Sequence, residues 1–198
     1  DSIKNMDSDN SCCIDIYILD NSDNIDIRKT IEYECIKQKY VYFSVNKNIG
    51  YFPIVSIVYS KIRDRYNNII ICNNDLEFNR EFIIKLKNIL LLDDEFIIAP
   101  LIVRTSDGKY QNPHVLYKLS KIRKLIYRIY YSSYCVSRII LSMYWLLSRI
   151  NIGERKDYKF QVDKTRIYMP FGACIVLTEL FLNQINIIDA PVFLMGEE

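Results

Sequence analysis

The sequence predicts a mixed α/β fold built around a mostly parallel sheet. Short apolar runs rich in Ile, Val and Tyr alternate with segments whose apolar residues follow helical spacing, and this alternation is typical of parallel sheets. Several expected strands also end on small polar residues, where α/β proteins hold ligands beyond the carboxyl ends of their strands. The chain has 198 residues, half of them apolar, which is enough to bury a core in one domain.

The first expected elements are a strand at residues 13–19, a helix at 25–38 and a strand at 40–45. Both strands are short apolar runs that end in polar turns, and the helix between them carries apolar residues at helical spacing. A second helix is expected at 53–65, because Pro53 suits the first turn of a helix.

The next expected strand is the β-branched run at residues 68–72. An amphipathic helix follows at 79–92, where Asn79 is suited to the N-cap, and the chain returns to a strand at 95–103. Residues 165–185 predict a strand, a glycine turn and a short helix in that order.

The segment between Gly108 and Gly153 has a different character. It contains no acidic residue, yet it holds eight Lys or Arg, seven Tyr and the only Trp of the chain. Apolar residues recur at helical spacing through 118–150, and the longest uncharged run, 139–148, is too short to span a bilayer. Three interpretations stay open for these helices: core packing, contact with a membrane surface, or binding of single-stranded nucleic acid.

Six cysteines form no CxxC pair and no metal-ligand grouping with His114, the only histidine. We therefore expect reduced, buried thiols in a cytosolic protein. The chain begins at Asp1 rather than Met and ends abruptly after "FLMG", so we expect a fragment that is cut at both ends.

The stretch "IIICNNDLEF" stops an apolar strand on Asn73, Asn74 and Asp75. These residue types tolerate tight turns, so a plain turn is one explanation. The other is a ligand site, because Asp20 and the loop "NKNIGY" fall at the ends of two other expected strands.

Four segments in this order resemble the family 2 glycosyltransferases with the GT-A fold. They are "IYILDNSDN", "NKNIGYF", "IIICNNDLEF" and "GACIVL" with "FLMGEE", and "DGKYQNP" is similar to the rhamnosyltransferase-like branch that builds bacterial surface glycans. The resemblance covers about residues 10–112 and 166–198. It implies a single, truncated GT-A-like domain over 1–198, with a mostly parallel central sheet flanked by helices and a basic helical insertion at 118–150.

The resemblance assigns the donor-binding residues one by one. Asp20 matches the aspartate that hydrogen-bonds the nucleotide base. Asn48 and Gly50 match the loop that lines the nucleotide pocket. Asn73 and Asn74 occupy the first two positions of the family's DxD motif, which holds the donor diphosphate.

The resemblance also implies a metal and a catalytic base. Asp75 matches the DxD carboxylate that helps hold a divalent cation, Mg²⁺ or Mn²⁺, and such sites commonly need only one or two carboxylates beside the substrate phosphates. Glu197 and Glu198 match the acidic pair that supplies the base in inverting members, with Glu198 favoured by its position. Without the resemblance, a solvated chain end would explain this pair.

The implied function is an inverting, metal-dependent glycosyltransferase that moves a sugar from a nucleotide donor to a lipid-linked or growing bacterial surface glycan. The implied partners are the donor, the glycan acceptor and an anionic membrane surface, with no nucleic acid. The implied location is the cytoplasm, peripherally at the inner face of the plasma membrane. The family's first strand is missing and Asn73 replaces an aspartate, so we expect the fragment to be inactive alone. The alternative is a non-catalytic nucleotide-binding or membrane-interacting module.

Overall fold

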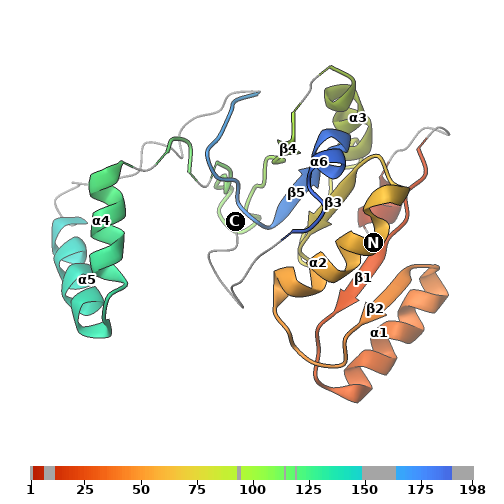
Figure 1. The fold of residues 1–198 in the computed structure, drawn as a ribbon, viewed down its shortest axis with the longest axis horizontal. Coiled ribbons are helices and arrows are strands. Elements are labelled where there is room, and N and C mark those ends of the chain that lie inside the picture. The colour runs from red at the N-terminus through yellow and green to blue at the C-terminus, as the bar shows by residue number, and fades with distance from the viewer. Residues whose placement is uncertain are drawn as a thin grey trace. The chain divides into compact units, whose positions relative to one another are not determined.

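A computed structural model describes residues 2–6, 12–92, 95–113, 115–118, 120–148 and 164–188 of the chain. In chain order its elements (Figure 1) are η1 (Ser2–Asn5), β1 (Tyr17–Asp20), α1 (Ile25–Gln38), β2 (Val41–Ser44), α2 (Tyr51–Ile62), η2 (Arg63–Arg65), β3 (Ile69–Cys72), α3 (Phe82–Leu92), β4 (Ile97–Ile98), α4 (Lys121–Tyr130), α5 (Tyr134–Ser148), β5 (Cys174–Leu177) and α6 (Glu179–Gln184). The mixed α/β class that the sequence predicted is confirmed.

The chain divides into two compact units. The first unit joins Asp1–Pro100 to Gly172–Glu198, and the second unit is the continuous segment Leu101–Phe171. The named strands all belong to the first unit, whereas α4 and α5 belong to the second. The helices expected within 118–150 are present as α4 and α5, and the assignment of the whole chain to one domain stays a prediction.

β1 and β2 form a two-stranded parallel sheet whose strands are connected through α1. Asn24 caps α1, since its side chain accepts two backbone N–H groups at 2.8 and 3.2 Å. Lys39 ends the helix in the left-handed conformation, with φ at 61°. The register places Asp20 opposite Ser44, so both strands end at the same edge of the sheet.

The core of the first unit gathers around α2. Tyr59 of this helix is 2 % exposed and Val176 of β5 is fully buried. The main cluster joins residues of α2, β3, β5 and α6, namely Val55, Tyr59, Ile71, Ile175, Leu177 and Leu182. Leu19 of β1 and Ile69 of β3 pack against the same cluster, so one core supports both sheets.

The second sheet is antiparallel and has β5 between β3 and β4. Cys72 pairs with Cys174, and all four residues of β5 are buried. The predicted mostly parallel central sheet is therefore wrong for the described strands, which form one parallel pair and one antiparallel group of three. The apolar runs in the sequence showed where strands lie. The shared partner of β3 and β4 is β5, which follows the whole of Leu101–Phe171 in the sequence, so no local pattern indicates this pairing.

The strand expected in residues 165–185 follows the glycine turn instead of preceding it. β5 begins at Cys174, after Gly172, and the described residues before that glycine contribute an isolated bridge between Met169 and Val115. Pro170 lacks an N–H group, which limits any ladder at that point. The short helix of the prediction is α6.

The second unit contains a pair of helices that contact each other, α4 and α5, drawn side by side in Figure 1. Within the residues that the structure describes, no helix is both long enough and apolar enough to cross a membrane. The location at the inner face of the plasma membrane stays a prediction.

The six cysteines are free thiols. Burial was predicted for all of them, and it holds for Cys35 and Cys174, whereas Cys13 and Cys135 are exposed. Burial raises the pKa of the Cys174 thiol to about 12, and the neighbouring Cys72 adds to the shift. At neutral pH this cross-strand pair therefore stays protonated and unreactive.

Candidate functional site

Asp20 ends β1 with a buried side chain, 5 % exposed. Its Oδ1 accepts the backbone N–H of Ser22 at 2.9 Å and also the Ser22 hydroxyl, and its Oδ2 accepts the Tyr42 hydroxyl at 2.7 Å. Burial alone would raise the pKa of the Asp20 carboxyl, but these hydrogen bonds and the charge of Arg28 hold it below its ordinary value of 3.8. An ionised carboxylate has about four acceptor positions, so Asp20 keeps room for a further donor.

Asn21 connects the loop after β1 to the loop after β2. Its Nδ2 donates to the Asn48 Oδ1 at 3.1 Å and to the Gly50 carbonyl at 2.8 Å, while its Oδ1 accepts the Ile49 N–H at 3.0 Å. Asp23 adds another link, since its Oδ1 accepts the Asn48 N–H at 2.7 Å. One side chain with three bonds thus fixes the second loop against the first.

Gly50 stands at the start of α2 and has φ at 97° and ψ at 165°. Residues with a Cβ rarely adopt this conformation, so a glycine is required here. The Gly50 N–H donates to the Asn48 Oδ1 at 3.0 Å, and in the described chain no side chain caps α2. The first N–H groups of a helix have no partner within the helix and favour anions. The loop therefore places an anion-compatible helix end beside Asn48.

Arg28 of α1 brings a positive charge to the same edge of the parallel sheet. Its Nη1 donates to the Asn46 Oδ1 in the loop after β2, and its charge lowers the pKa of Asp20. Its Nε is buried and has no hydrogen-bond acceptor among the described residues. The residue as a whole is half-buried, and a guanidinium forms charge-assisted hydrogen bonds with carboxylates and phosphates.

Three of the predicted donor-binding residues lie in the loops at the ends of β1 and β2. Asn48 and Gly50 are bonded to Asn21 and to each other, whereas Asp20, the residue before Asn21, is bonded to Ser22 and Tyr42. The sequence did not predict the residues that act on them. Asn21 bonds Asn48 and Gly50, Tyr42 bonds Asp20, and the charge of Arg28 acts on Asp20. Asn21 follows the strand end directly, and that position was a usable signal. The other two come from neighbouring elements, so only the pairing of β1 with β2 reveals them.

The turn after β3 is a separate feature. The Asn73 N–H donates to the Ala173 carbonyl at 2.9 Å, which extends the pairing of β3 with β5 by one residue. Asn74 and Asp75 are exposed. The described residues show no hydrogen bond or ion pair between this turn and the network around Asp20.

The predicted metal site depends on this turn. The described residues include no group of three His, Cys, Asp or Glu side chains that could hold a metal ion. Asp75, with the side-chain oxygen of Asn74 next to it, supplies hard oxygen ligands that suit Mg²⁺ or Mn²⁺ only when substrate phosphates complete the shell. Glu197 and Glu198, the predicted catalytic pair, lie outside the described residues.

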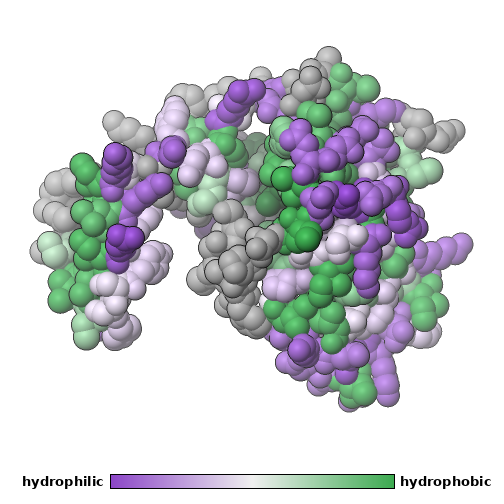
Figure 2. Space-filling view, in the orientation of Figure 1, coloured by the Kyte–Doolittle hydropathy of each residue, from purple (hydrophilic) through white to green (hydrophobic). Residues whose placement is uncertain are grey.

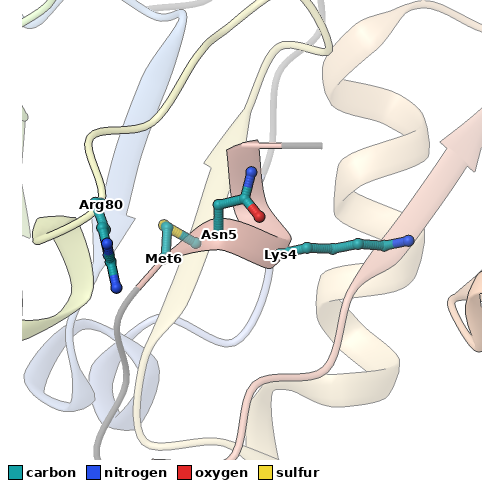
Figure 3. A pocket seen from close by; sticks show the side chains of 4 residues that line it. All are labelled: Lys4, Asn5, Met6 and Arg80. Atoms are coloured by element: carbon teal, nitrogen blue, oxygen red, sulfur yellow. The ribbon is translucent and has the colours of Figure 1, made fainter.

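The first unit also has an open hollow of about 550 Å³ away from the predicted residues, lined by Lys4, Asn5, Met6 and Arg80 (Figure 3). Its two cations do not converge, because Lys4 points away from Arg80. The Lys4 ammonium instead donates to Gln38 and lies 5.9 Å from the centre of the Tyr40 ring. This hollow therefore offers no focused anion site.

Comparison with known proteins gives no match to a family model, to a curated protein sequence or to a solved structure. The resemblance to family 2 glycosyltransferases therefore stays a prediction.

Proposed function

We propose that this chain is part of a glycosyltransferase that binds a nucleotide-diphosphate sugar at the carboxyl ends of β1 and β2. The observation that carries the proposal is that Asp20, Asn48 and Gly50 lie in the two loops that follow β1 and β2, which Asn21 and Asp23 bond to each other. The charge of Arg28 and the start of α2 at the same edge add groups that favour an anionic ligand.

Each part of such a donor has a suitable counterpart. The remaining acceptor position of Asp20 suits an N–H group of the base, and Arg28 suits a phosphate oxygen. Asp75 would hold a divalent cation, and the charge of that cation would neutralise the negative charge of the departing diphosphate. Glu198, with Glu197 beside it, would take the proton from the acceptor hydroxyl, since a hydroxyl is a weak nucleophile until a base is within reach. The proposed acceptor is a lipid-linked or growing bacterial surface glycan.

The finer fold is part of the proposal. In the described strands, β1 pairs on one edge with β2, and β3 pairs on one edge with β5. Leu19 of β1 and Ile69 of β3 pack on the same core cluster, so the two open edges belong to one layered unit. A further strand between β1 and β3 would join the two sheets into the single sheet of a GT-A fold.

Calorimetry with UDP and dTDP nucleotides, with and without Mn²⁺, tests the proposal. We expect binding to one of them, and we expect Arg28→Gln to weaken it roughly 10- to 100-fold, because a hydrogen bond to a charged group contributes about 1.5–3 kcal/mol. Arg65→Gln, an exposed change outside the network, is the matched control. If neither nucleotide binds under any condition while circular dichroism shows a folded chain, the proposal fails.

The alternative is a nucleotide-binding module without catalysis. Asn73 in place of an aspartate favours it, as does the exposure of Asn74 and Asp75. The two functions differ in their metal dependence. A transferase site should bind the nucleotide more tightly with Mn²⁺ and should lose that gain in Asp75→Ala. Equal binding with and without Mn²⁺, unchanged in this variant, identifies the module.

A further inference from the structure

The helical hairpin formed by α4 and α5 exposes apolar side chains along its length. In α4, Ile122, Leu125, Ile126 and Ile129 recur at positions i, i+3, i+4 and i+7, which places them on one face. These four side chains are between 47 % and 73 % exposed. Figure 2 shows the apolar surface of these helices beside hydrophilic residues. The described residues of the second unit leave this stripe uncovered.

The side of α4 next to this stripe is basic. Lys121, Lys124 and Arg128 lie at positions i, i+3 and i+7, and the two lysines are exposed, as is the arginine. The sequence from residue 109 to residue 153 contains no acidic side chain to neutralise them. A helix with an apolar face beside a cationic face suits a partner that has an apolar layer beneath an anionic surface.

α5 also exposes large apolar side chains. Ile139, Met143 and Trp145 are 61 %, 59 % and 57 % exposed. The guanidinium of Arg138 lies 5.9 Å from the centre of the Tyr134 ring, so a cation and an aromatic ring sit together one turn apart. Tyr and Trp combine an apolar body with a polar tip and are enriched where membranes meet water.

We infer that the α4–α5 hairpin docks on the surface of an anionic lipid bilayer, lying in the plane of the interface. Acyl chains would cover the apolar stripe, and acidic headgroups would face Lys121, Lys124 and Arg128. Single-stranded nucleic acid satisfies the charges but leaves four aliphatic side chains in water, so lipid accounts for more of the surface. The inference is independent of nucleotide binding by the first unit.

Trp145 provides a local probe, because it is the only tryptophan of the chain. The chain is mixed with vesicles of phosphatidylcholine containing 30 % phosphatidylglycerol, and with vesicles of phosphatidylcholine alone. We expect co-sedimentation with the anionic vesicles, weaker at high salt, together with a blue shift of Trp145 emission and its quenching by brominated acyl chains. Equal binding to both vesicle types, or unchanged emission at low salt, overturns the inference.

Variants separate the two faces of α4. The triple change Lys121→Gln, Lys124→Gln and Arg128→Gln should lower the partition onto anionic vesicles on the order of a hundredfold, since each basic residue near such a surface contributes a factor of several. Ile122→Ser with Ile129→Ser should keep the charge but reduce the quenching of Trp145.

A matched control removes the same charge from the first unit through Lys29→Gln, Lys37→Gln and Lys85→Gln, all at exposed positions. This control should bind vesicles nearly as well as the unchanged chain. An equal loss in the control shows that net charge alone attracts the lipid and contradicts docking by the hairpin. Salt-dependent binding to single-stranded DNA without any binding to vesicles also overturns the inference, in favour of a nucleic-acid surface.

Discussion

The first unit and the α4–α5 hairpin use apolar residues in opposite ways. In the first unit, β5 arrives from a distant part of the sequence and buries all four of its residues between β3 and β4. In the hairpin, Leu125 and Ile126 stay about half exposed although the helical pattern around them is strong. A local sequence pattern therefore does not predict whether its apolar residues are buried, because burial depends on long-range partners.

A matched pair of leucine substitutions tests this difference with the largest expected effect. Leu177→Ala removes a side chain that is 3 % exposed, and we expect it to lower the free energy of unfolding by about 2–5 kcal/mol. Leu125→Ala in α4 removes the same atoms from a side chain that is 56 % exposed, and the expected change is within about 0.5 kcal/mol. Urea unfolding followed by circular dichroism measures both, and similar losses would show that the hairpin has a buried face in solution.

The same comparison can be made with polar side chains, for which we expect smaller losses of stability. Asn21→Ala removes the three bonds that join two loops, so we expect a loss of about 1–3 kcal/mol from the groups left without partners. Ser142→Ala removes a bond to the Arg138 carbonyl in the preceding turn of the same helix. Such local bonds contribute little or nothing to a helix, so its effect should be close to zero. Equal effects in urea unfolding would contradict the structural role of Asn21.

The smallest expected effect is the response to acid. The Asp20 carboxyl has a pKa below its ordinary value, so its contribution to stability is complete above about pH 4 and is lost as the pH falls through the lower, folded-state pKa. Asp20→Asn should flatten this part of the stability profile below pH 4, at a lower overall stability. The sequence around the hairpin has no acidic residue, so Trp145 emission should stay constant from pH 5 to pH 3. An acid-induced shift of that emission would reveal contact with carboxylates elsewhere.

The elements of this fold could largely be predicted, but their pairing could not. The helix at 25–38 agrees with the structure, because capping by Asn24 and short-range spacing determine it locally, whereas the strand expected at 13–19 forms only at Tyr17–Asp20. The direction of the second sheet could not be predicted, because it depends on which strand lies between β3 and β4. The strand at Cys174–Leu177 was misplaced because a short apolar run is compatible with either a strand or a helix.

In the candidate site, too, some residues could be predicted from the sequence and others depend on how the strands pair. Asp20, Asn48 and Gly50 could be selected as residues at strand ends, and parallel pairing of β1 with β2 brings them together. Tyr42 could not be selected, because its hydroxyl reaches Asp20 only after β2 is in register. The turn at Asn74 and Asp75 could be predicted from its residue types, whereas its position relative to Asp20 does not follow from the spacing of these motifs.

The central position of β5 also has a consequence for synthesis on the ribosome. β3 and β4 emerge early, yet each has β5 as its neighbour in the sheet, and β5 follows the whole of Leu101–Phe171. Translation of that segment takes on the order of 10 seconds at about 5–20 residues per second. During this interval the nascent chain holds two apolar strands without their partner, while α4 and α5, which need only local contacts, can already form. Chaperone binding to the nascent chain should therefore concentrate on the strands at Ile69–Cys72 and Ile97–Ile98 and should end when Leu177 has left the exit tunnel.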